Sequence, residues 1–100
     1  MKEYDLFVPS IVEGKRLSAH TLTSLKQRLI KHFGGLTYFP QKTKGFWKIG
    51  SVTFQDDIVI LRVLSAKSSN LFWKRLSNEL KIQWKQKEIL IVARQVSILK

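Results

Sequence analysis

The sequence predicts a single α+β domain in which two helices cover one face of an antiparallel sheet. The chain has 100 residues, which is the length of one domain and is enough for one hydrophobic core. Two segments carry apolar residues at helical spacing, and the segments around them are rich in the residues that favour strands. Hydrophobic residues make up 44% and charged residues 25% of the chain, as in ordinary globular proteins.

The first strand is expected in YDLFVPSIV (4–12). Pro9 cannot donate a hydrogen bond to a neighbouring strand, so this strand should be bulged or lie at an edge. After the turn-like EGKR, a helix is predicted over 19–33, because Ser18 can cap its first N–H groups and Gly34 can end it in the left-handed conformation. Its apolar face carries Leu22, Leu25, Leu29 and Phe33, with Leu17 and Leu22 as a hydrophobic staple.

The middle of the chain is expected to hold a short strand LTYF (36–39), a loop PQKTKG (40–45) and an extended stretch (46–54) that turns near Gly50. IVILRVL (58–64) is a strong strand pattern. The pair Asp56-Asp57 before it is interpreted as a turn or bulge, in preference to a catalytic or metal site. Two adjacent carboxylates alone do not make such a site.

A second helix is predicted to begin after Ser69, with Phe72, Trp73, Leu76 and Leu80 on its apolar face. EILIVARQVSIL (88–99) then closes the chain as a long strand. The order strand, helix, strand, strand, helix, strand is that of the ferredoxin-like βαββαβ sandwich, in which a four-stranded antiparallel sheet carries both helices on one face. One ferredoxin-like domain is therefore expected over residues 1–100.

Apolar residues occupy both faces of the expected strand 58–64. Ile58, Ile60 and Leu64 fall on one face, and Val59, Leu61 and Val63 fall on the other. Because helices can cover only one face, the second face requires another layer, most simply a second copy of the protein. The sequence thus predicts a homodimer, with candidate pocket or interface residues Phe46, Trp47, Val59, Leu61 and Val63.

The net charge is +11 and the sequence pI is near 10.3. This charge favours nucleic acid or another polyanion as a partner, although a merely solvated, lysine-rich surface is an equally open interpretation. If the charge is functional, phosphate groups would be contacted without reading of the bases by outward residues of the two helices, namely Arg28, Lys31, Lys74 and Lys81.

Several classes of protein are disfavoured. The chain has no cysteine, so thiolate metal sites and disulfides are excluded. His20 and His32 lie about 120° apart around one helix, so they cannot jointly hold a metal without ligands from outside the helix. The sequence shows no phosphate loop or dinucleotide motif, and no cofactor is expected. The charged first twenty residues and the absence of a long apolar run predict a cytoplasmic protein without a membrane segment.

Two stretches resemble RNA-recognition domains. DLFVPSI is similar to their first-strand hexapeptide, and KGFWKI is similar to their octapeptide. Only Phe7 and Phe46 stand where the family's stacking aromatics would be, because Lys48 and Ser51 replace the others. This resemblance therefore ranks below the assembly hypothesis.

A second resemblance covers about half of the chain. FGGLT, GFWKIG and DD, with QKEILI near the end, resemble the pattern of a loose group of small bacterial proteins with a ferredoxin-like fold; the matching positions are Gly34, Gly35, Thr37, Gly45, Trp47, Gly50 and Asp57. The resemblance implies the fold and no activity. Trp47 is interpreted as a core or interface plug and not as a ligand stacker.

Three functions follow from these observations. The first is a non-catalytic, homo-oligomeric binding or assembly module. The alternative is a nucleic-acid binder that uses the basic helix faces, and the third is a small dimeric enzyme. For the enzyme, the strand residues Asp5, Glu88 and Arg94 would be the first to consider, because one buried ionisable group can suffice.

Overall fold

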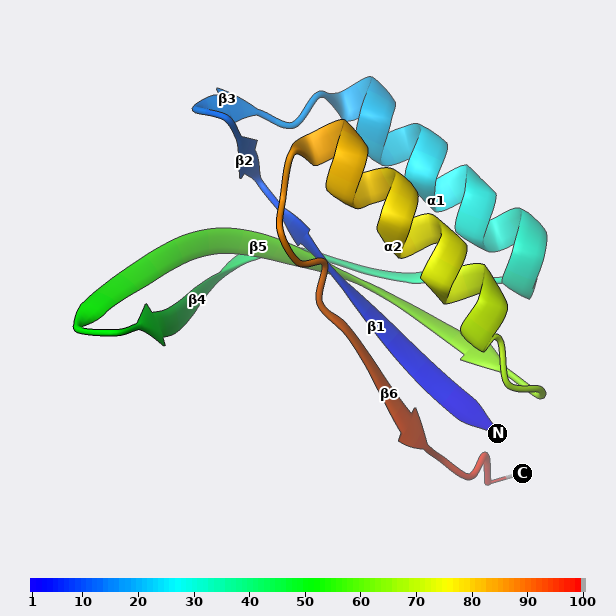
Figure 1. The fold of residues 1–100 in the computed structure, drawn as a ribbon. Coiled ribbons are helices and arrows are strands. Elements are labelled where there is room, and N and C mark those ends of the chain that lie inside the picture. The colour runs from blue at the N-terminus through cyan, green and yellow to red at the C-terminus, as the bar shows by residue number, and fades with distance from the viewer. Residues whose placement is uncertain (100) are drawn as a thin grey trace.

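The computed structural model describes residues 1–99, apart from the side chains of residues 42, 47, 49 and 54. Within these residues the chain forms two helices, α1 (Ala19–Phe33) and α2 (Asn70–Trp84), and six strands (Figure 1). The strands are β1 (Lys2–Pro9), β2 (Ile11–Val12), β3 (Lys15–Arg16), β4 (Thr37–Ile49), β5 (Val52–Ser65) and β6 (Ile91–Gln95).

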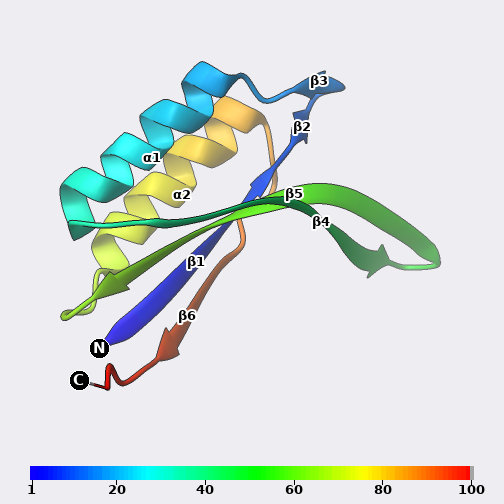
Figure 2. The same cartoon turned by 180° about the vertical axis from the view of Figure 1, so that it is seen from behind.

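The main sheet has four antiparallel strands in the order β4-β5-β1-β6. Both helices lie on the same face of this sheet, as the two opposite views show (Figures 1 and 2). This is the ferredoxin-like βαββαβ arrangement, and the predicted fold class is confirmed.

The hydrophobic core lies between the sheet and the helices. Tyr4 pairs with Val63, Leu6 with Leu61 and Val8 with Val59 in the register of β1 and β5, and residues opposite one another share a face of the sheet. All six are buried and point toward the helices, whose contribution to the core is Leu25, Leu29, Trp73, Leu76, Leu80 and Trp84.

Helix α1 forms over the predicted residues because both of its ends are capped locally. Ser18 has extended backbone angles and its side chain accepts a hydrogen bond from the N–H of Thr21 at 3.1 Å. At the other end, Gly34 has φ 84° and donates its N–H to the carbonyl of Ile30. Helix α2 also begins after Ser69, as predicted, although the Ser69 side chain makes no capping hydrogen bond.

The hairpin of β4 and β5 is longer than expected. The stretch 40–45, predicted as a loop, belongs to β4, which continues through a register shift between Phe39 and Thr43. The predicted turn at Asp56-Asp57 is wrong, because these residues lie inside β5 and pair with Gly45 and Lys44. A continuous ladder satisfies their backbone groups without a turn. The far end of the hairpin projects beyond the helical layer (Figures 1 and 2).

The two outer ends of the chain also differ from expectation. β1 ends at Pro9, and the chain then forms the small β2–β3 hairpin, whose turn has positive φ at Glu13 and Gly14. The closing strand β6 covers Ile91–Gln95 instead of 88–99, and its ladder with β1 runs from Leu6 opposite Ile91 to Lys2 opposite Gln95. Glu88 lies outside the strand, in the segment before it.

Candidate functional site on the open face of the sheet

The face of the sheet opposite the helices, called here the open face, carries three rows of side chains that cross the strands. The register places Phe39, Ile60 and Phe7 in the first row, Thr37, Arg62, Asp5 and Val92 in the second, and Leu64, Glu3 and Arg94 in the third. Phe39 and Leu64 are 37% and 43% exposed, so the apolar part of this face meets solvent in the single chain. Contiguous exposed apolar patches are a common feature of binding surfaces, which makes the open face the candidate site.

A network of four charged side chains fills the centre of the open face. Asp5 is only 2% exposed, and its two carboxylate oxygens accept hydrogen bonds from Nε and Nη2 of Arg62 at 2.7 and 3.0 Å. Nη1 of Arg94 donates to Asp5 at 3.0 Å and to Glu3 at 2.9 Å. Arg62 also lies 3.1 Å from Glu3 and over the ring of Phe39. The network contains two acids and two arginines and is therefore balanced in charge.

The environment stabilises the ionised forms of three members of this network, Asp5, Arg62 and Arg94. The pKa of Asp5 lies below its usual range, chiefly because its carboxylate accepts a hydrogen bond from Arg62. Burial opposes this shift, and the hydrogen bond from Arg94 adds to it. The hydrogen bond to Asp5 raises the pKa of Arg62, and that to Glu3 raises the pKa of Arg94. An acid that is held ionised in this way is a structural anchor and is poorly suited to take up a proton near neutral pH.

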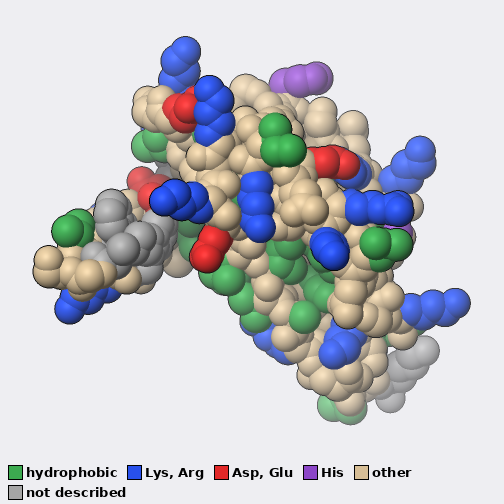
Figure 3. All heavy atoms as spheres, viewed as in Figure 1, with side chains coloured by type: hydrophobic (Ala, Val, Ile, Leu, Met, Phe, Trp, Pro, Cys, Tyr) green, Lys and Arg blue, Asp and Glu red, His purple; other side chains and the backbone are tan. Residues whose placement is uncertain are grey.

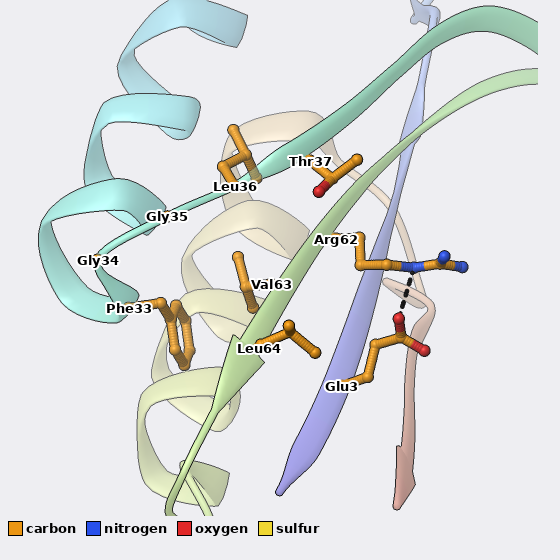
Figure 4. A pocket seen from close by; sticks show the side chains of 9 residues that line it. All are labelled: Glu3, Phe33, Gly34, Gly35, Leu36, Thr37, Arg62, Val63 and Leu64. Atoms are coloured by element: carbon orange, nitrogen blue, oxygen red, sulfur yellow. Dashed lines mark ion pairs between the residues drawn. The ribbon is translucent and has the colours of Figure 1, made fainter. Parts of the chain in front are cut away.

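A hollow of about 520 Å³ opens where β4 begins and β5 ends (Figure 4). Its walls come from the end of α1, the turn after it, and the last residues of β5; they are Glu3, Phe33, Gly34, Gly35, Leu36, Thr37, Arg62, Val63 and Leu64. β4 pairs with β5 only as far as Thr37 opposite Arg62, and the chain before Thr37 diverges toward α1. The hollow lies in the resulting wedge, which is called here the edge hollow.

The predicted interface residues of β5 are on the other side of the sheet. Val59, Leu61 and Val63 are 7%, 0% and 1% exposed and lie in the core beneath the helices. The prediction that these three residues form an interface is therefore wrong. The helices cover the odd-numbered residues of β5 and leave Ile58, Ile60 and Leu64 on the open face. Val63 nonetheless contributes to the wall of the edge hollow.

The structure describes the side chain of only one of the two candidate aromatic residues of the hairpin, Phe46 and Trp47. Phe46 is 63% exposed, and its role as a pocket or interface residue stays a prediction. The side chain of Trp47 lies outside the described residues, so its role as a plug stays a prediction. Phe46 pairs with Gln55, whereas Phe7 pairs with Ile60, which places the two phenylalanines on opposite faces of the sheet. They do not form one stacking surface.

The predicted basic residues do lie on the helical layer. The helices carry Lys26, Arg28, Lys31, Lys74, Arg75 and Lys81, against the single acid Glu79. Figure 3 shows Lys and Arg side chains spread over this side of the molecule. Arg28 is paired with Glu79 across the two helices through two hydrogen bonds, so its charge is partly compensated, while Lys31 and Lys74 are exposed and Lys81 is half-buried.

The two histidines, His20 and His32, both lie on α1. His32 is stacked on Phe72 with ring centroids 3.9 Å apart. No group of three or more His, Asp or Glu side chains able to hold a metal occurs among the residues that the structure describes. Within the same residues, neither helix is long and apolar enough to cross a bilayer.

The sheet, the two helices and the open face define the chain as a small ferredoxin-like protein. No protein-family model matches it, and no curated protein matches its sequence. Solved structures do match its fold. The divalent cation tolerance protein CutA1 from Thermus thermophilus is 16% identical with a TM-score of 0.66, and the match covers 100% of this chain and 88% of that one.

Two further structures are similar to this chain. A variant of CutA1 from Pyrococcus horikoshii is 13% identical with a TM-score of 0.60, over 100% of this chain and 87% of that one. A phage SAM lyase in its apo state is 14% identical with a TM-score of 0.63, over 93% of this chain and 78% of that one. At these identities the similarity establishes the shared fold.

Sequence reasoning found only part of the open-face network. Asp5 and Arg94 were singled out as charged strand residues, but Glu3 and Arg62 were not. Arg62 interrupts the apolar run IVILRVL, and a charged residue inside such a run is the signal that could have indicated a paired acid on the neighbouring strand.

Proposed function

We propose that this protein is a non-catalytic, homo-oligomeric binding or assembly module and that its copies associate through the open face of the sheet. The observation that carries the proposal is the row Phe39, Ile60 and Phe7, which is apolar and only partly covered in the single chain. A second layer over the face that the helices leave open would remove this apolar row from water.

The distribution of charge favours a second copy as that layer. The chain carries a net charge of +11, so two copies repel one another wherever their basic surfaces meet. The helical layer has six Lys and Arg residues and one acid, whereas the acids and arginines of the open-face network balance. Electrostatic repulsion between two copies is therefore smaller when they meet through their open faces than when they meet through their helical layers. Figure 3 shows the basic side chains over the helical side.

Sedimentation velocity over a range of micromolar concentrations tests this proposal. The 11.7 kDa chain is expected to sediment as a dimer or larger oligomer. Ile60→Glu places an unpaired charge in the apolar row and should shift the protein toward the monomer. Ile82→Glu is the matched control, since Ile82 is 80% exposed on α2 and the substitution should leave the oligomer intact. A wild-type chain that remains monomeric would refute the proposal.

Polyanion binding by the helical layer is the second candidate, and the concentration of basic residues on α1 and α2 favours it. It does not conflict with assembly, because the two activities use opposite faces of the sheet. The exposed Lys31 and Lys74 and the half-buried Lys81 would contact phosphates, with Arg28 held in place by Glu79.

The salt dependence of binding to a short nucleic-acid duplex tests the second candidate. Each lysine that contacts a phosphate contributes about 0.9 to the slope of log affinity against log salt concentration. Replacing Lys74 and Lys81 by Gln should lower the slope by about 2. Replacing Lys15 and Lys87, which are exposed and lie outside the helices, is the control. Equal effects of both pairs would show that the helical layer has no special role.

An enzyme is the third candidate, and one of the proteins with a similar fold is named a SAM lyase. A catalytic role would need an ionisable group that faces a pocket and can exchange a proton. Asp5 is buried between two arginines, and Glu88 is exposed in the segment before β6. The assembly proposal therefore rests on more of the observed geometry.

A further inference from the structure

Among the residues that the structure describes, part of the central strand β5 has no partner on the side of the edge hollow. β5 is paired on one side by β1 as far as Ser65 opposite Lys2, but on the other side β4 reaches only Arg62. Alternate residues of a strand direct their N–H and C=O groups to opposite neighbours. Within the three residues Val63–Ser65, at least one therefore directs both groups into the hollow. Such an edge accepts an added strand.

The hollow has the shape and lining that an extended apolar chain requires. Phe33, Leu36 and Leu64 provide apolar walls. Gly35 has no side chain, and a Cβ built there meets no atom within 4 Å, so the wall is open on that side. Figure 4 shows that the turn after α1 and the end of β5 face each other across the hollow.

The segment that follows β6 has complementary properties. Residues 96–99, Val-Ser-Ile-Leu, were predicted to be part of a strand, but β6 ends at Gln95, and beyond it the N–H of Val96 donates to the carbonyl of Met1 at 2.9 Å. Ile98 and Leu99 are 51% and 93% exposed. Val96 and Ile98 favour strands, but within the described part of the chain residues 96–99 belong to no strand.

The hollow and the segment lie at the same end of the sheet. Lys2 pairs with Ser65 of β5 on one side and with Gln95 of β6 on the other. Because β5 and β1 separate β6 from the hollow, the segment cannot continue β6 in a straight line into the hollow of its own chain. Two copies that meet at this end can each offer their segment to the other.

We propose that residues 96–99 of one copy add as a strand to the free edge of β5 in a second copy and fill its edge hollow. The inference rests on the proposed self-association and names the segment and the receiving site. Three observations carry it: the edge of β5 that β4 does not pair beyond Arg62, a hollow with apolar walls beside that edge, and the segment 96–99, which carries three apolar side chains and forms no strand in the described chain. The hollow also shares Arg62 and Leu64 with the open face, so one assembly can bury both surfaces.

Cross-linking by engineered cysteines tests the inference, since the natural chain has no cysteine. A Gly35→Cys variant and an Ile98→Cys variant are purified separately, mixed, and oxidised. If the segment occupies the hollow of another copy, a disulfide between positions 35 and 98 should form and be identified in the linked peptides by mass spectrometry. Because each variant carries only one cysteine, a disulfide between positions 35 and 98 must join two different chains.

The matched control mixes Ile98→Cys with Ile82→Cys, which places an exposed thiol on α2. The yield of the 35–98 disulfide should exceed that of the 82–98 disulfide by about tenfold or more. In the assembly the two thiols at 35 and 98 are held together, so their effective concentration is far above that of randomly colliding chains. As a second readout, Ile98→Asp should weaken self-association about tenfold, whereas Ile82→Asp should not.

The outcomes separate this inference from the proposed function. If the wild-type chain is oligomeric but the 35–98 bond does not exceed the control, the inference is wrong and the assembly proposal stands. If the chain is monomeric and no bond forms, both are wrong. If a double variant forms the 35–98 bond within one chain while the mixture does not, the segment folds back on its own molecule and the inference is overturned.

Discussion

Asp5 of β1 and Arg62 of β5 face each other across the open side of the sheet and are joined by two hydrogen bonds of 2.7 and 3.0 Å. The pair occupies one register position, and Asp5 also accepts a bond from Arg94 of β6. These interactions link three adjacent strands through their side chains. Asp5 is 2% exposed on a face that no helix covers, because the arginines themselves shield it.

Replacement of Asp5 by Asn should lower the free energy of unfolding at neutral pH by about 2 kcal/mol, because the arginines lose a charged partner but remain partly hydrated. The folded pKa of Asp5 lies below its ordinary value. Its contribution is therefore complete above the unfolded pKa of about 3.9 and is lost as pH falls through the folded pKa.

Urea denaturation between neutral and strongly acidic pH checks this prediction. The difference between wild type and Asp5→Asn should be largest at neutral pH and should shrink below about pH 4. Asp56→Asn is the control. Asp56 is half-buried in β5, and its replacement should lower the free energy of unfolding by less than Asp5→Asn does. A difference that stays constant down to acid pH would contradict a role for the ionised Asp5.

Leu61 and Ile60 are neighbours on β5 that face opposite sides of the sheet. Leu61→Ala should cost about 2–5 kcal/mol of stability, because Leu61 is 0% exposed and its truncation leaves a cavity in the core. Ile60→Ala should cost clearly less in dilute protein, where the open face is not covered. Thermal unfolding at low and high protein concentration measures both effects, and equal losses would contradict the assignment of the two faces.

Gly34 and Gly35 are adjacent but differ in backbone conformation. Gly34 has φ 84°, a left-handed conformation that costs an L-residue about 1–2 kcal/mol, so Gly34→Ala should be destabilising. At Gly35 a Cβ meets nothing within 4 Å, and Gly35→Ala should be neutral or stabilise by about 0.5 kcal/mol. Denaturant midpoints of the two variants provide the comparison; the reverse order would show that the turn is not built as described.

Ser18 and Ser69 both precede a helix, but only Ser18 caps it with its side chain. Ser18→Ala should cost about 1 kcal/mol because the N–H of Thr21 loses its acceptor. Ser69→Ala should change stability by less than about 0.5 kcal/mol. Melting temperatures measure the difference, and a loss of similar size in both variants would argue against the distinct roles of the two side chains.

Local signals account for the parts of the fold that sequence analysis predicted well. Helix α1 has the predicted bounds because its cap residues Ser18 and Gly34 act within a few residues of the helix ends. The stretch 40–45 and the pair Asp56-Asp57 were assigned wrongly, because their residue types favour turns and only pairing between β4 and β5 keeps them extended. Strand pairing is a long-range property that a short sequence window does not contain.

The sequence by itself determined the fold class, the order of the main elements, the helix caps and the presence of apolar residues on both faces of β5. Tertiary structure alone decided which face the helices cover, and it thereby placed Val59, Leu61 and Val63 in the core and Ile60 on the open face. Alternation along a strand separates two faces but does not say which one is covered. The network of Glu3, Asp5, Arg62 and Arg94 likewise exists only because the strand register brings together residues from β1, β5 and β6.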